Sequence, residues 1–119
     1  MTDDLQHLKT IERRLLWLSH WMIHHANHVR PNPDGIKVGG HQASSASMVS
    51  IITALYFSAL RPEDRVAVKA HASPVFHAMQ YLMGNLDRAR MEAFRGWGGV
   101  QSYPSRTKDV DDVDFSTGS

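Results

Sequence analysis

The chain contains no cysteine, which excludes disulfide staples and thiol catalysis and is compatible with a reducing cytosol. No apolar run approaches the roughly 20 residues of a membrane span, and the first residues lack the apolar core of a signal peptide. The net charge is only +1, and no basic run carries interleaved aromatic residues. Nothing therefore predicts binding to nucleic acid or membranes, and we expect a cytoplasmic protein of one domain or part of one.

Apolar periodicity predicts a mainly helical chain. A long amphipathic first helix is expected to end before Pro31 and Pro33, which cannot continue it. A second helix should bury a stripe made of Met48, Ile51, Ile52, Leu55, Tyr56 and Ala59. Ser73 suits the N-cap of a third helix, which Gly84 should terminate. The expected helices span about residues 4–29, 44–60, 74–83 and 86–94.

Only one strand is expected, in residues 65–69, which are rich in β-branched side chains. A single strand cannot make a sheet, and an unpaired strand edge is unfavourable. We therefore predict an α/β fold whose parallel sheet is incomplete in this chain and is finished by sequence beyond Ser119.

The first candidate site lies in residues 38–45. Gly39 and Gly40 let the backbone approach a ligand closely, and His41 directly precedes a helix whose first turn is rich in serine. A helix N-terminus of this kind suits a phosphate group. An ordinary glycine turn before a serine-capped helix would give the same pattern, so this motif alone leaves both readings open.

The second candidate site follows the predicted strand, where Lys69, His71 and Ser73 occur at alternate positions. Ligands of open α/β sheets bind beyond the carboxyl ends of strands, and the next helix start would add N–H donors. A surface lysine and a loop histidine with a structural role are the alternative. Two candidate anion sites, each at a predicted helix start, together support a ligand-binding function more strongly than either site does alone.

Three motifs in order carry a family resemblance. They are Gly-Gly-His-Gln-Ala-Ser in residues 39–44, Lys-Ala-His-Ala-Ser-Pro in residues 69–74 and Gln-Ser-Tyr-Pro in residues 101–104. From about Leu15 to Ser119 the chain resembles the N-terminal segment of the homodimeric pyruvate dehydrogenase decarboxylating component, a transketolase-like enzyme. The resemblance implies a partial thiamine-diphosphate-binding domain over residues 1–119, with residues from about 38 facing the cofactor. It also implies a homodimer acting on a 2-oxo acid or ketose substrate.

The resemblance assigns roles to five residues. His41 and His71 would be catalytic residues near the diphosphate and the reacting carbon of the cofactor, and Ser44 would shape the same pocket. Lys69 would bind the diphosphate. The family has an uncharged polar residue at this position, so the lysine is a departure from its pattern that bears on the diphosphate contact and on the identity of the substrate. Tyr103 would reach the cofactor from its loop. In such enzymes the protein positions the cofactor, which performs the carbon–carbon chemistry.

The magnesium site of the family is missing from this sequence. It comes from a Gly-Asp-Gly segment, and no such segment occurs here. We therefore expect thiamine diphosphate with Mg²⁺ in the complete enzyme, no metal ligand in this chain, and no activity of the chain alone. A non-catalytic helical module for dimerisation or partner binding is the alternative function.

Histidines are unusually dense in the predicted first helix, at positions 20, 24, 25 and 28. Residues four apart on a helix can share a metal ion, so a histidine-rich zinc protein is a third hypothesis. No carboxylate or cysteine completes the set, however, and Trp17 and Trp21 lie close by. These features favour packing or a subunit contact over a metal site.

Overall fold

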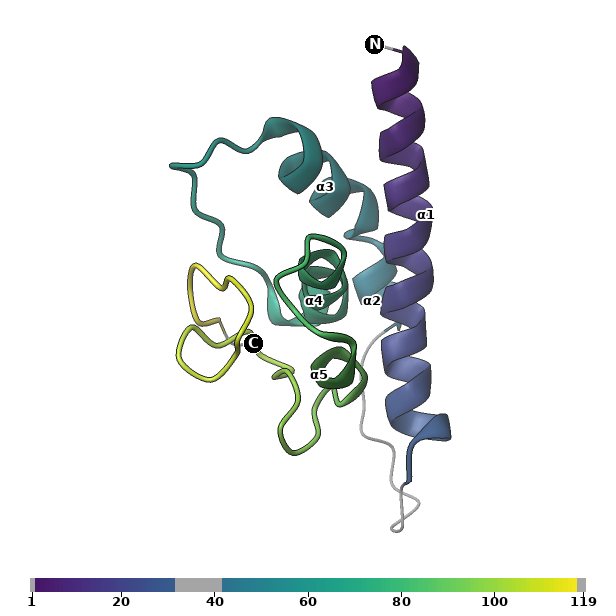
Figure 1. The fold of residues 1–119 in the computed structure, drawn as a ribbon, viewed down its shortest axis with the longest axis vertical. Helices are drawn as coiled ribbons and strands as arrows, with labels where there is room; N and C mark the ends of the chain where they lie inside the picture. Colours follow the sequence, from purple (N-terminus) through teal and green to yellow (C-terminus); the bar gives the residue numbers. More distant parts are fainter. Residues whose placement is uncertain (1, 32–41, 118–119) are drawn as a thin grey trace.

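The computed structural model describes residues 2–31 and 42–117, and within them the protein is helical without any β-strand (Figure 1). The α-helices are α1 (Thr2–His24), α2 (Gln42–Ala46), α3 (Val49–Ala54), α4 (Ser73–Leu82) and α5 (Arg88–Glu92). Two π-helical turns, η1 (His25–Val29) and η2 (Leu55–Ala59), and the 3₁₀ turn η3 (Ala70–Ala72) complete the regular structure.

Helix α1 with its π-helical end η1 confirms the long first helix. Its apolar residues recur at spacings of three and four, so Leu15, Met22 and Ala26 lie fully buried on one face. The N–H of Arg30 donates to the carbonyl of His25 and closes the last, wider turn. The chain then leaves the helix one residue before Pro31.

The predicted second helix is interrupted, and its expected stripe is partly wrong. A turn at residues 47–48 separates α2 from α3, and the Ser47 hydroxyl donates to the Ser44 carbonyl there. The buried face of α3 consists of Val49, Ile52 and Thr53. Two members of the predicted stripe are exposed instead, namely Ile51 and Ala59.

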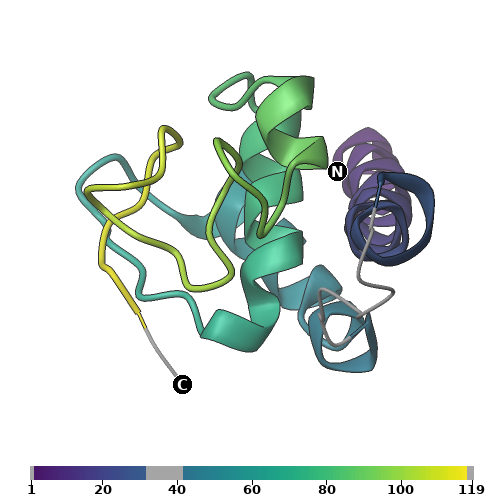
Figure 2. The ribbon, with the colours of Figure 1, turned by 90° about the horizontal axis from the view of Figure 1, so that it is seen from below.

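Helix α4 is the centre of the molecule, and eight of its ten residues are buried. It contacts α1, α2, α3 and α5. Figures 1 and 2 show it between α1 on one side and the C-terminal segment on the other. The N-cap residue is Ala72 and not the predicted Ser73, because the preceding 3₁₀ turn already directs Ser73 into the helix. Gly84 ends the helix as predicted, with a φ of 86° that suits glycine.

The predicted strand in residues 65–69 does not form among the described residues. Side chains from the C-terminal segment satisfy backbone groups that a sheet would otherwise pair. Asp114 accepts a hydrogen bond from the N–H of Val66 at 2.9 Å, and the Thr117 hydroxyl donates to the Val68 carbonyl at 2.6 Å. The predicted fourth helix shortens to α5, and no helix in the described part of the chain is both long and apolar enough to span a membrane.

Candidate functional site

A small cavity of about 90 Å³ lies where the start of α4 meets the segments that follow α5. It is lined by Ala70, His71, Ser73, Pro74, Phe94, Arg95, Ser102 and Tyr103. Two of the five predicted site residues, His71 and Tyr103, are thus brought together from separate loops. This convergence makes the cavity the candidate functional site.

His71 owes its position to the 3₁₀ turn η3. The N–H of Ala72 donates to the carbonyl of Lys69 at 2.9 Å and closes the turn. Ala70 and Ala72 are buried on either side of His71, whereas His71 itself is exposed. The two alanines anchor the turn in the core, so the imidazole is held at the surface beside the cavity.

Tyr103 lies on a loop that is fixed at both of its ends. The carboxylate of Asp109 accepts hydrogen bonds from the N–H of Gln101 at 2.8 Å and from that of Ser105 at 2.7 Å. Pro104 is buried, and its carbonyl accepts the N–H of Thr117. Sequence reasoning missed Asp109, since nothing in an acidic stretch distinguishes the carboxylate that folds back on the loop.

Arg95, which lines the cavity, is another residue that sequence reasoning missed. It has a φ of 63°, and it is the non-glycine residue with a positive φ among those described. Its N–H donates to the Val100 carbonyl at 2.9 Å, which closes a glycine-rich loop over residues 95–100. That loop also carries Trp97, whose side chain is fully exposed.

The cavity is lined by donors and carries no described carboxylate. Its polar lining residues are a histidine, an arginine, a tyrosine and the serines Ser73 and Ser102, which all carry N–H or O–H groups, and Ala70, Pro74 and Phe94 complete the lining. Such groups fit an oxyanion, such as a phosphate or a carboxylate. Its small volume suits one small group of a ligand and not a whole cofactor.

Of the other predicted site residues, Lys69 and Ser44 are not among the described residues that line this cavity. Lys69 is exposed at the N-cap of η3, and Ser44 is half-buried in α2, which packs against η3. Ser44 and His71 therefore lie on adjoining elements. His41 lies outside the described residues.

A buried ionisable pair, His77 and Asp111, was also not predicted. The two side chains are completely buried, and His77 Nδ1 lies 2.6 Å from Asp111 Oδ2. His77 Nε2 lies 3.0 Å from the carbonyl oxygen of Gln101, which can only accept. The carbonyl of Gln101 therefore accepts the Nε2–H of the imidazole, and Nδ1 faces the carboxylate of Asp111. Full burial keeps this pair from any solvent-borne ligand, so its role is structural.

The histidines of α1 and η1 do not converge. The rings of His24 and His28 lie 5.2 Å apart, whereas His25 Nδ1 bonds to the Glu92 carbonyl and His20 Nδ1 to that of Leu16. Across residues 2–31 and 42–117, no group of three or more potential ligands lies close enough to hold a metal ion. The structure offers no support for the zinc hypothesis there.

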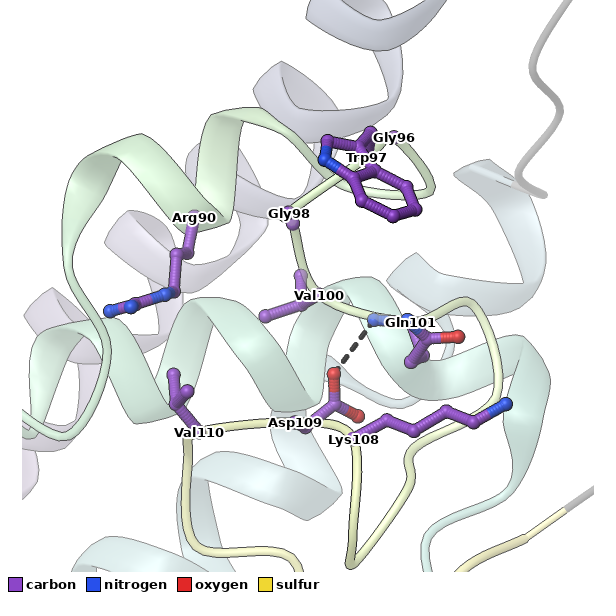
Figure 3. Close-up of a pocket in the computed structure, with 10 residues that line it drawn as sticks. Arg90, Gly96, Trp97, Gly98, Val100, Gln101, Lys108, Asp109 and Val110 are labelled. Atoms are coloured by element: carbon purple, nitrogen blue, oxygen red, sulfur yellow. Dashed lines mark hydrogen bonds between the residues drawn. The ribbon is translucent and has the colours of Figure 1, made fainter.

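A wider hollow of about 440 Å³ lies beside the glycine-rich loop (Figure 3). Its cations do not point at a common centre, because Arg90 lies on one side and Lys108 on the other. Its carboxylate, Asp109, is engaged with the N–H of Gln101. Without converging polar groups this hollow is a weaker candidate than the smaller cavity.

No family model matches the chain. The pyruvate dehydrogenase E1 components of Mycolicibacterium smegmatis and Mycobacterium tuberculosis are each 31% identical to it over 109 residues, covering 79% of this chain and 11% of theirs. That of Pseudomonas aeruginosa is 35% identical over 107 residues, covering 79% of this chain and 12% of its own length. Over about four fifths of its length, the chain is thus related to the pyruvate dehydrogenase E1 component, of which it spans only a small part.

Proposed function

We propose that this chain forms part of the cofactor pocket of a thiamine-diphosphate enzyme acting on a 2-oxo acid. The observation that carries the proposal is the meeting of His71 and Tyr103 at one donor-lined cavity. The relationship to proteins named pyruvate dehydrogenase E1 component agrees with it in substrate class. In this proposal residues 1–119 are part of one domain, and the long first helix supports a cofactor-facing part from about residue 38.

The residues of the cavity fit one end of such a cofactor. His71, Ser73 and Tyr103 would hold an anionic group through their N–H and O–H donors. The bound cofactor would supply the carbanion for carbon–carbon chemistry, and these side chains would orient it. His71 is also suited to holding or moving a proton near neutral pH.

The remaining predicted residues complete the proposal. Ser44 and Lys69 would border the pocket from α2 and from the start of η3, and His41 would join them as the second catalytic histidine. Mg²⁺ would be held by residues other than these, since no Gly-Asp-Gly segment occurs in the sequence. We also propose a cytoplasmic homodimer as the working form.

Cofactor binding tests the proposal directly. Titration with thiamine diphosphate and Mg²⁺ should shift the amide resonances of Ala72, Ser102 and Tyr103 in ¹⁵N spectra of the chain. His71→Ala should weaken binding about tenfold, as expected for the loss of a charge-assisted hydrogen bond. His24→Ala removes an exposed histidine of α1, which is distant from His71 in the sequence, and serves as the matched control. An unshifted wild-type spectrum, or equal binding by both variants, would contradict the proposal.

One observation favours the alternative function, a helical interaction module. Trp17 is 63% exposed on α1 and stacks on Trp21 with ring centroids 5.8 Å apart. A hollow of about 620 Å³ beside it reaches Tyr81 and Leu82 at the end of α4. Exposed aromatic surface of this kind is typical of contact sites. Sedimentation of the wild type and of Trp17→Ser tests it: self-association lost in the variant would support a dimerisation surface.

A further inference from the structure

Arg95 occupies a backbone conformation that disfavours its own side chain. A positive φ costs a residue other than glycine about 1 kcal/mol, because Cβ approaches the following carbonyl. Glycine would fill this position without strain, as Gly98 does in the same loop with a φ of 76°. Strained residues gather at functional sites, so an arginine here suggests a use for its side chain.

The loop enforces this conformation on Arg95. The N–H of Arg95 donates to Val100, and the N–H of Gly96 donates to the Ala93 carbonyl at 2.7 Å. The chain then passes so close to the end of α5 that a Cβ at Gly99 would overlap the Ala93 carbonyl. The loop thereby fixes the direction in which the Arg95 side chain leaves the backbone.

The surroundings of the Arg95 side chain contain no described carboxylate. Arg95 lines the 90 Å³ cavity with His71 and Tyr103, and it also lines an adjoining hollow of about 530 Å³ with Trp97, Gln101 and Ser102. The neighbouring arginines differ in this respect. Arg88 pairs with Glu92 at 3.3 Å, and Arg90 pairs with Asp87 at 3.4 Å.

We infer that Arg95 is an anion-binding residue that receives a small oxyanion at the mouth of the cavity beside His71 and Tyr103. The planar guanidinium binds carboxylates and phosphates through paired hydrogen bonds, and the cavity has room for one such group. The inference rests on the proposed function, and it names a specificity residue that neither the motifs nor the comparisons assign. The oxyanion is either the carboxylate of a 2-oxo acid or a phosphate of the cofactor.

Variants at Arg95 separate binding from stability. Arg95→Gly removes the charge and relieves the strained φ, so its thermal midpoint should equal or exceed that of the wild type. Arg95→Ala removes the charge and keeps the strain. Arg88→Ala removes an exposed arginine of α5 that pairs with Glu92, and is the matched control.

The experiment titrates each chain with pyruvate, inorganic phosphate and thiamine diphosphate, and follows the amides of Gly96 and Ser102 and the Nε–H of Arg95 in ¹⁵N spectra. We expect about tenfold weaker binding of the oxyanion probes by Arg95→Gly and Arg95→Ala, partial recovery in Arg95→Lys, and unchanged binding by Arg88→Ala. Pyruvate binding that persists beside saturating thiamine diphosphate assigns Arg95 to the substrate carboxylate. Competition between the two assigns it to the diphosphate.

Two results would overturn the inference. If Arg95→Gly binds every probe as the wild type does while His71→Ala still weakens thiamine diphosphate, Arg95 is only a turn residue and the proposed function stands. If the wild-type resonances around Arg95 move with none of the three probes, the oxyanion role fails, and the proposed pocket fails with it.

Discussion

The two sides of α4 are held together by different forces. On one side α1 and α3 pack against it through apolar side chains, among them Leu15, Met22 and Ile52. On the other side residues 101–117 form no helix or strand, and they contribute only Val113 to the apolar core while several polar contacts attach them to it. Gln80 illustrates this, since its amide bonds to the backbone of Asp112 from within a buried helix.

The difference teaches which parts of this molecule tolerate change. Apolar packing is not directional, so the stability of the helical side depends on the side-chain volume that fills it. Substitutions there should lower the stability in proportion to the volume that they remove. A buried polar contact depends on its partner, because a donor or charge left alone in the core is strongly unfavourable. The loops that shape the candidate site lie on the polar side, so their geometry depends on a few specific bonds.

Breaking the His77–Asp111 pair should have the largest effect. Asp111→Ala leaves the fully buried His77 without its partner, and the loss of one member of a buried ion pair lowers the free energy of unfolding by about 3–5 kcal/mol. Urea unfolding measures it. Asp112→Ala removes a neighbouring exposed carboxylate and should shift the midpoint little.

A double variant sharpens this result. Replacing both members with leucine removes the unpaired group as well as the pair, so it should recover much of the lost stability. If Asp111→Ala unfolds no more readily than Asp112→Ala, the polar side of α4 is not held by this pair, and the contrast between the two sides fails.

Removing core volume on the apolar side should have the next largest effect. Leu15→Ala empties a fully buried position on α1 and should destabilise the protein by about 3 kcal/mol. The adjacent Leu16 is 42% exposed, so Leu16→Ala should shift the unfolding midpoint much less. Equal shifts for the two variants would show that α1 does not pack on α4 through the face described.

Sequence periodicity predicted the helices on the apolar side of α4, because their buried residues recur at regular spacings along the chain. The spacing of Leu15 and Met22 gave the long helix, and Gly84 gave the end of α4. Periodicity failed at Ile51, because the buried residues Ser45, Val49 and Ile52 recur at spacings of four and three and place the inward face on the other side of the helix. It failed in residues 65–69 because Asp114 and Thr117, distant in sequence, take the backbone bonds of the expected strand.

Two residues that line the candidate cavity stand in motifs that the sequence shows. His71 and Tyr103 stood in recognisable motifs, and the structure places both at one cavity. Arg95, Asp109 and Asp111 carry no such signal, since their positions follow from long-range contacts and from one unusual φ. Such contacts join residues far apart in sequence, and neither local propensity nor composition encodes them.

The glycine-rich loop over residues 95–100 offers a smaller test. Gly99→Ala would place a methyl group against the Ala93 carbonyl, and the backbone must shift, at about 1–3 kcal/mol. Gly98→Ala is the matched variant: nothing lies within 4 Å of its Cβ, so only its positive φ opposes it, by about 1 kcal/mol. Thermal unfolding ranks the two, and the reverse order would contradict the close passage of the loop over α5.

The smallest expected effect concerns Tyr56, whose ring packs edge-on against Phe76 of α4. Burial, with added repulsion from Asp114 and Asp112, raises the pKa of Tyr56 to about 12. The folded protein therefore favours the neutral phenol, and the stability this contributes is intact below about pH 10 and is lost as the pH rises toward 12. The absorbance titration of Tyr56→Phe, subtracted from that of the wild type, should leave a single tyrosinate transition near pH 12. A difference titration centred near pH 10 would show that the acidic segment does not lie against this ring.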